Sequence, residues 1–148
     1  MYQTVALLGD ISAGLHGHDH PRGGVLYAVR DGAAFLYIGK TTKSVWPHVR
    51  KHLRSDDALG RAARAAVPHA ARWQVEVCIV VGERGINVVE GELIRRYRPR
   101  LNWTNNRGHP RTIFAQRQFQ NRSVIGPTCL ALIDDGWPVF TGIAREVR

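Results

Sequence analysis

Sulfur-containing residues are scarce in this chain. Two cysteines and one methionine occur among 148 residues. Cys78 and Cys129 are far apart in the sequence and stand in apolar stretches, where cysteine usually acts as a small hydrophobic residue. The sequence therefore lacks the Cys-x-x-Cys pairs of a structural zinc site and the cysteine density of a disulfide-stabilised scaffold.

Long hydrophobic runs are also absent. The apolar run at residues 5–8 is soon followed by Asp10, and it is far shorter than the roughly 18 residues that a membrane-spanning helix needs. Hydrophobic residues make up 44% of the chain and charged residues 22%, a balance that predicts one compact folded domain. We therefore expect a soluble, cytoplasmic protein without a membrane partner.

Acidic residues are few and unevenly placed. There are 12 of them against 21 lysines and arginines, and none occurs between Glu92 and Asp134. A segment with charge of one sign repels itself unless it meets an anion, and nucleic acid is the common intracellular polyanion. The sequence predicts a nucleic-acid partner, with double-stranded DNA as the first choice and a merely solvated basic face as the alternative. The arginines expected to bind it are Arg95, Arg96, Arg98, Arg100, Arg107 and Arg111.

The middle of the chain has the pattern of an α+β domain. Residues 25–30 and 34–38 are rich in β-branched, aromatic and aliphatic residues, and the intervening Asp31-Gly32 suits a tight hairpin turn. Apolar periodicity and cap residues predict the next elements of the core. These are helices at residues 45–54 and 57–67, a strand at residues 73–81 and a helix from residue 86 that ends before Pro99.

Two extensions flank this core. A short strand at residues 3–8 and an irregular arm are expected before it, and a second hairpin, with strands at residues 128–133 and 138–143, after it. The predicted division is an N-terminal strand and arm at residues 1–22, a core at residues 23–102 and a basic linker with a hairpin at residues 103–148. The core should hold a mainly antiparallel three-stranded sheet flanked by helices.

Three short motifs stand out within the core. They read Gly24-Val25-Leu26-Tyr27, Tyr37-Ile38-Gly39-Lys40-Thr41 and Glu90-x-x-Leu93-Ile94-x-x-Tyr97-x-Pro99-Arg100-Leu101-Asn102. Together they resemble the GIY-YIG nuclease family over about residues 24–102. The resemblance implies a small GIY-YIG-like α/β sandwich and a metal-dependent endonuclease that hydrolyses DNA phosphodiester bonds and leaves a 5′-phosphate.

Glu90 belongs to the most specific of the three motifs. Helical spacing from Ile86 and to Leu93 puts its carboxylate on the apolar face of the last core helix, where a charge needs a cation or several donors. The resemblance assigns it a single divalent ion, Mg²⁺ with Mn²⁺ as a substitute, which suits an oxygen ligand. The alternative is an ion pair with an arginine across the core; Glu92 should simply pair with Arg95 or Arg96 on the exposed side.

The two motif tyrosines are expected on neighbouring strands. The resemblance makes Tyr27 a general base, and Lys40 would have to lower the pKa of its phenol, since a free phenol with a pKa of about 10 is a poor base. Tyr37 would join the same hydrogen-bond network, although both tyrosines are also ordinary strand residues that simply pack. Asn102 would tether a loop, contact a phosphate, or only cap the chain after the helix.

The chain departs from the family pattern at two places. Val25 stands where the first motif has glycine, and His48 stands where the family has an arginine four residues before a histidine or tyrosine, here His52. Arg50 is nearby but points about 200° away from residue 48 on a helix. A histidine with a pKa of about 6.5 cannot replace a permanent guanidinium. The alternatives are therefore a weakened or inactive nucleic-acid-binding module on the same fold, or a nuclease directed to RNA or to a particular structure.

Other patterns leave further alternatives open. The pair His48 and His52 has the spacing of metal ligands, and so does the run His16-Gly17-His18-Asp19-His20, although both are more often ordinary polar residues. Residues 105–111 are small, basic and stiffened by proline, which suits either a minor-groove arm or an inert linker. A dimer, whose two sites would cut both strands, also stays open.

Overall fold

The computed structural model describes residues 2–14, 24–80, 83–102 and 122–140, which combine helices with one antiparallel sheet. The sheet has four strands in the order β1-β4-β2-β3. Three strands were predicted; the fourth is the N-terminal one, which pairs along its whole length with β4. The strands are β1 (Tyr2–Leu7), β2 (Val25–Asp31), β3 (Ala34–Thr41) and β4 (Gln74–Ile79).

Strands β2 and β3 form the predicted hairpin. Gly32 in its turn has a φ of 58°, a left-handed conformation that glycine adopts without steric cost. The pairing register shifts between Val29 and Arg30, so that Leu36 on β3 is the extra residue of a β-bulge. Because of this bulge, Leu36 and the adjacent Tyr37 both pack on the same side of the sheet.

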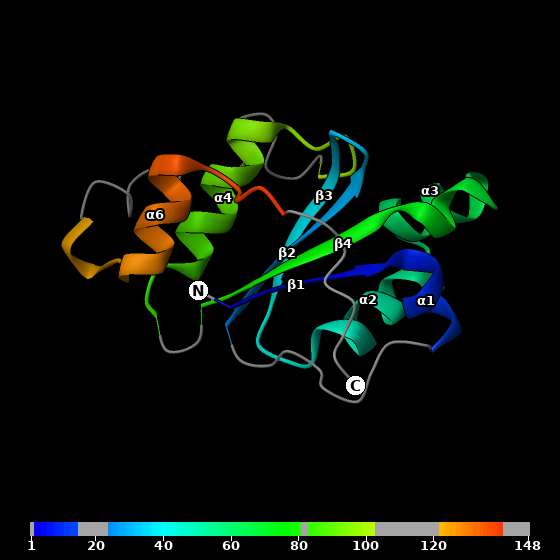
Figure 1. The fold of residues 1–148 in the computed structure, drawn as a ribbon, viewed down its shortest axis with the longest axis horizontal. Helices are drawn as coiled ribbons and strands as arrows, with labels where there is room; N and C mark the ends of the chain where they lie inside the picture. The colour runs from blue at the N-terminus through cyan, green and yellow to red at the C-terminus, as the bar shows by residue number, and fades with distance from the viewer. Residues whose placement is uncertain (1, 15–23, 81–82, 103–121, 141–148) are drawn as a thin grey trace.

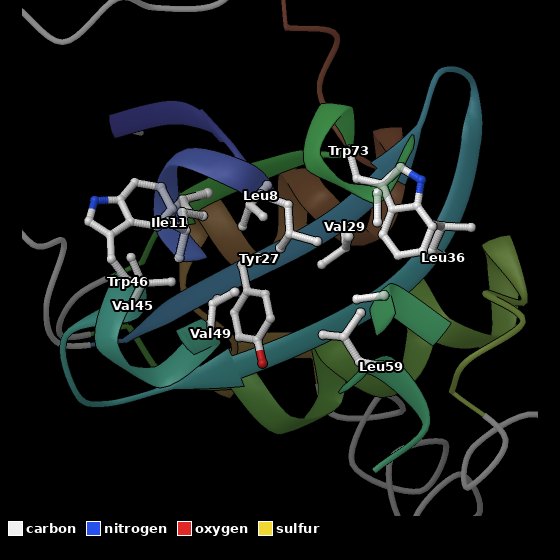
Figure 2. Close-up of a cluster of buried hydrophobic side chains, with 14 of the residues drawn as sticks. Leu8, Ile11, Tyr27, Val29, Leu36, Val45, Trp46, Val49, Leu59 and Trp73 are labelled. Carbon is white, nitrogen blue, oxygen red and sulfur yellow. The ribbon is translucent and has the colours of Figure 1, made fainter. Parts of the chain in front are cut away.

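Helices α1 to α3 cover the first face of the sheet, on one side of it in Figure 1. The apolar residues between them and the sheet form the first core cluster, which includes Tyr27, Val49 and Trp73 (Figure 2). Helix α2 has the predicted limits, and Asp57 caps α3 by accepting from the amide of Gly60. Helix α1 was not predicted. The elements on this face are α1 (Leu8–Ala13), α2 (Val45–Arg54), α3 (Ala58–Ala65) and the 3₁₀ helix η1 (His69–Arg72).

Helices α4 and α6 cover the second face, on the opposite side of the sheet (Figure 1). Helix α4 (Ile86–Tyr97) agrees with the prediction. The predicted C-terminal hairpin is wrong, because Pro127–Asp135 forms α6, preceded by the 3₁₀ helix η3 (Arg122–Val124). Three of its residues recur at helical spacing and are buried against the sheet and α4: Cys129, Leu132 and Ile133.

Polar contacts fasten both ends of α6 to the core. At its start, Oε1 of Glu83 accepts from the amides of Thr128, at 2.6 Å, and Cys129, at 3.2 Å. At its end, Nη1 and Nη2 of Arg96 donate to the carbonyls of Ile133 and Asp134. These contacts satisfy amide and carbonyl groups that a helix leaves unpaired at its ends. The C-terminal region is therefore built into the domain.

A buried carboxylate links Trp137, just after α6, to the sheet. Glu76 on β4 is only 2% exposed. Its Oε1 accepts from Nη1 of Arg30 at 3.2 Å and from Nε1 of Trp137 at 3.0 Å. These two donors offset the cost of burying its charge. In the described part of the chain, no helix has the length and apolar character to cross a bilayer.

Candidate active site

The two motif tyrosines lie next to each other on the first face of the sheet. Tyr27 on β2 pairs across the strands with Gly39, and Tyr37 lies two residues before that glycine on β3. Side chains two residues apart on a strand share a face, so the rings are diagonal neighbours with centroids 6.0 Å apart. The hydroxyl groups of Tyr27 and Tyr37 share a hydrogen bond. The prediction that these tyrosines occupy neighbouring strands is confirmed.

Gly39 leaves the space in which these phenols meet. A Cβ atom at this position would lie 2.5 Å from the Tyr27 hydroxyl oxygen and 2.8 Å from Cε1 of Tyr37. Both separations are shorter than a van der Waals contact, so a side chain here would displace the rings. The glycine of the second motif is thus required by the tyrosine of the first. Figure 2 shows the Tyr27 ring beside Val49 with its hydroxyl directed away from Leu8.

Two histidines of α2 complete a cluster of four rings with the tyrosines. His48 and His52 are one helical turn apart, with ring centroids separated by 4.9 Å. The His48 ring meets Tyr27 edge-on at 5.8 Å, and the His52 ring lies 5.5 Å from Tyr37. We call Tyr27, Tyr37, His48 and His52 the four-ring cluster. It brings together side chains from β2, β3 and α2.

Arg50 does not take part in the four-ring cluster. Its guanidinium lies beside Gly14, at the end of α1. On this other side of α2, it lines a cleft of about 260 Å³ together with Pro47, Lys51, Arg54 and Ser55. Helical geometry therefore keeps Arg50 on a different face of α2 from His48, as the 200° offset predicts. Its place is a basic surface cleft.

The imidazole of His48 is uncharged at neutral pH. The pKa of His48 is lowered, first by burial and then by the neighbouring basic groups of His52, Lys51 and Lys43. Imidazole with a lowered pKa is uncharged at neutral pH. Within the cluster, His48 therefore acts as a neutral donor or acceptor and cannot copy a guanidinium.

Both phenols are held in the protonated form. Burial is the largest cause that raises the pKa of Tyr27 well above its usual value, followed by the proximity of Tyr37, Glu90 and Asp57. The pKa of Tyr37 is raised by burial, Glu90 and Asp57, although its hydrogen bond with Tyr27 lowers it. These directions are opposite to the change that a phenolate base needs.

The strand register shows on which face of the sheet Lys40 lies. Lys40 pairs with Leu26, and the Leu26 side chain belongs to the second core cluster, beneath α4 and α6. Side chains alternate along a strand, so Lys40 lies on the face opposite the tyrosines. Lys40 is not among the groups that shift the pKa of Tyr27, so its predicted effect on the phenol stays a prediction.

Glu90 adds negative charge to the site from α4. It is half-buried, between the fully buried Val89 and Gly91 of the same helix. Its charge raises the pKa of both Tyr27 and Tyr37, so its carboxylate acts on the two phenols even though α4 covers the second face. A single carboxylate, with phosphate oxygens and water as the other ligands, is a common way for proteins to hold Mg²⁺. The residues present fit an ion of this kind.

Sites with several protein ligands are not found in the described residues. Among residues 2–14, 24–80, 83–102 and 122–140, no three His, Cys, Asp or Glu side chains converge as a metal site. The pair His48 and His52 thus finds no third ligand of these types there. The histidines of the arm, His16, His18 and His20, lie outside the described residues.

Asn102 tethers the segment after α4 to the edge of the sheet. Its Oδ1 accepts from the amide of Ile38 at 2.6 Å, and its Nδ2 donates to the Ile38 carbonyl at 2.8 Å. The neighbouring amide of Leu101 donates to the carbonyl of Leu36 at 3.0 Å. Asn102 is only 6% exposed, so of its predicted roles the tether is the one observed. It holds β3, which carries Tyr37, against the end of α4.

The arginines expected to bind nucleic acid differ in their surroundings. Arg95 pairs with Glu92 at 2.7 Å, as predicted, and Arg96 is engaged at the end of α6. Arg98 and Arg100 are exposed just after α4. Arg107 and Arg111 lie outside the described residues.

Asp57 is a site residue that the sequence analysis missed. Its Oδ2 lies 2.7 Å from Nδ1 of His52, while its Oδ1 accepts from the amide of Gly60 at 2.8 Å. Its charge also raises the pKa of both tyrosines. The available signal was an acidic helix cap five residues after a site histidine.

Comparisons of the chain with protein-family models, with curated proteins and with solved structures find no match. The groups that bear on function are the four-ring cluster and the two carboxylates whose charges act on its phenols, Glu90 and Asp57. These groups come from β2, β3, α2, the start of α3, and α4.

Proposed function

We propose that this protein is a divalent-metal-dependent endonuclease of GIY-YIG type that hydrolyses DNA phosphodiester bonds. The observation that carries the proposal is the four-ring cluster, which brings together side chains from β2, β3 and α2, with the charge of Glu90 on α4 raising the pKa of both phenols. Tyr27, Tyr37 and Glu90 come from the three separate motifs, and packing alone does not require a carboxylate whose charge acts on two phenols. A carboxylate beside neutral donors suits a metal-bound phosphate.

Glu90 is the residue that would hold the ion, Mg²⁺ or Mn²⁺. When bound, such an ion polarises a phosphate and offsets the negative charge that develops on its oxygens. Glu90 also explains why the phenols must stay neutral, since two further negative charges beside it would be repelled. The chain supplies the remaining groups as oriented hydrogen-bond donors.

The two tyrosines have different roles in orienting the phosphate. Tyr27 is fully buried and its hydroxyl is hydrogen-bonded to Tyr37, so it acts as a positioning residue. Tyr37 is only half-buried, so its hydroxyl is the one that would bind a phosphate oxygen. Donors fixed before the reaction stabilise growing negative charge more effectively than water does.

Positive charge for the nucleic-acid backbone comes from α2 and its surroundings. Lys43 and Lys51 lie close enough to His48 to lower its pKa. Arg50, Lys51 and Arg54 line the cleft on the outer side of the same helix. Such contacts bind phosphates without reading the sequence, and their affinity falls steeply as salt rises.

Plasmid nicking tests the proposal. Purified protein should convert supercoiled plasmid to the nicked form with Mg²⁺ or Mn²⁺, and Glu90→Ala should lower the rate by about 100-fold or more. Glu92→Ala is the matched control, because Glu92 is on the same helix and pairs with Arg95 on its outer side. It should cleave at the wild-type rate. Wild-type activity in Glu90→Ala, or none in the wild type, would refute the proposal.

A second candidate is favoured by His48. The neutral ring at the arginine position supports a nucleic-acid-binding module that has lost turnover. In that case the wild type binds duplex DNA in a salt-dependent manner and leaves plasmid intact with either ion. A substrate panel of duplex, branched and RNA molecules then distinguishes DNA from RNA or structure-directed recognition.

A further inference from the structure

We propose that Asp57 and His52 form a carboxylate–imidazole dyad in which His52 takes the proton from the attacking water. This inference rests on the proposed nuclease function and assigns its general base to an imidazole. His52 would be a catalytic residue, and Asp57 a positioning residue that acts through it.

The contact with Asp57 fixes which ring nitrogen of His52 carries the proton. Nδ1 of His52 lies 2.7 Å from Oδ2 of Asp57. A carboxylate only accepts hydrogen bonds, so Nδ1 is the donor, and in the uncharged form of the ring the free lone pair is on Nε2. A free lone pair on Nε2 is what proton removal from water requires.

Asp57 is itself held rigidly. Its Oδ1 accepts from the amide of Gly60 at 2.8 Å, in the first turn of α3. The two carboxylate oxygens thus have separate tasks, one at the helix and one at the imidazole. A carboxylate fixed in this way also stabilises the imidazolium that forms after proton transfer.

His52 is better placed to meet water than Tyr27 is. The side chain of His52 is 23% exposed, whereas Tyr27 is fully buried and its hydroxyl is already engaged with Tyr37. The His52 ring lies 5.5 Å from Tyr37, the residue placed to bind a phosphate oxygen. A water between the imidazole and that phosphate would face both groups.

The proposed step balances as a hydrolysis. Nε2 of His52 takes one proton while the water oxygen forms a bond to phosphorus, and the bond from phosphorus to the 3′-oxygen breaks. The 3′-oxygen leaves with the bonding electrons and is protonated by solvent, which gives a 3′-hydroxyl and a 5′-phosphate. The imidazolium then returns its proton to bulk water.

Asp57→Asn separates this role from a structural one. Asparagine caps helices as well as aspartate does, and the Gly60 amide needs an acceptor, so the amide oxygen should stay at α3. The NH₂ group of the new residue then faces Nδ1 of His52 and turns it into an acceptor. The ring proton moves to Nε2, and the imidazole can no longer take a proton from water.

The experiment combines rates with a spectroscopic signature. With Mg²⁺, Asp57→Asn and His52→Ala should each slow plasmid nicking by about 100-fold or more, the usual effect of losing a general base. Long-range ¹H–¹⁵N NMR should show the Nδ1–H tautomer of His52 in the wild type and the Nε2–H tautomer in Asp57→Asn. Asp31→Asn is the matched control. Asp31 pairs with His69 at a distance of 3.1 Å, and neither residue belongs to the four-ring cluster.

The outcomes distinguish the dyad from the nuclease proposal. If the wild type cleaves, Glu90→Ala does not, and Asp57→Asn cleaves at the full rate, the dyad is wrong and the nuclease proposal stands. An Nε2–H tautomer in the wild type also overturns the dyad. A wild type without metal-dependent cleavage overturns both proposals.

Discussion

Replacing Asn102 by alanine should loosen the contact between the edge of the sheet and the end of α4. The Asn102 amide forms two hydrogen bonds with Ile38, at 2.6 and 2.8 Å, and is only 6% exposed. Alanine removes both bonds and leaves an amide and a carbonyl of β3 without these partners. Each of these two backbone groups then has to find water or stay unpaired.

The size of this effect follows from the cost of unpaired backbone groups. Leaving a buried donor or acceptor unsatisfied costs about 1–3 kcal/mol. Strand β3 is at the edge of the sheet, where water can replace part of the loss. We therefore expect Asn102→Ala to lower the free energy of unfolding by about 2–4 kcal/mol. For a chain of this length, that corresponds to a fall in Tm of about 4–16 °C.

Urea unfolding followed by circular dichroism measures this change. Asn87→Ala, at an exposed position in α4, is the control and should stay within about 0.5 kcal/mol of the wild type. Asn102→Asp should be destabilised as well, because a carboxylate accepts from the Ile38 amide but repels its carbonyl. If Asn102→Ala were as stable as Asn87→Ala, the tether would contribute nothing and the reasoning would fail.

Two further predictions concern the phenols. Gly39→Ala puts a Cβ 2.5 Å from the Tyr27 hydroxyl and should cost about 1–3 kcal/mol in urea unfolding; an unchanged midpoint would show that the rings move freely. Because burial raises the pKa of Tyr27 and Tyr37 in the folded state, stability should be fully present below about pH 10 and decline above it, where unfolded tyrosines ionise. The free energy of unfolding, measured from about pH 8 to 11, should fall less steeply with pH in Tyr27→Phe than in the wild type.

Local signals in the sequence were sufficient for the central elements. Helices α2 and α4 have their predicted limits because an apolar stripe and nearby Ser44, Pro47 and Pro99 mark where they begin and end. The hairpin of β2 and β3 was predictable because Gly32 tolerates the positive φ of its turn. In each case the deciding interaction lies within a few residues of sequence.

Features that depend on distant partners were not predictable. The pairing of β1 with β4 joins residues about 70 positions apart, and nothing in β1 alone indicates that contact. Helix α6 was misread as a strand because a short apolar run fits both periods. Pro127 at its start and Gly136 after its end were the available helix signals.

The sequence indicated the two tyrosines and two histidines that form the four-ring cluster, but it did not indicate Asp57. Helical spacing correctly put His48 and His52 on one face and Arg50 on another. The face of the sheet on which Lys40 lies depends on strand register, and the contact of Asp57 with His52 depends on where α3 begins. A linear motif encodes neither.

The fastening of α6 defines the smallest part of the chain that can fold by itself. A fragment that stopped at Asn102 would contain all three motifs but would leave Glu83 and Arg96 without the helix ends they bind. It would also remove Trp137 from buried Glu76 and uncover the apolar surface of α4. Such a fragment should aggregate when expressed, so the autonomous folding unit extends well past the last motif.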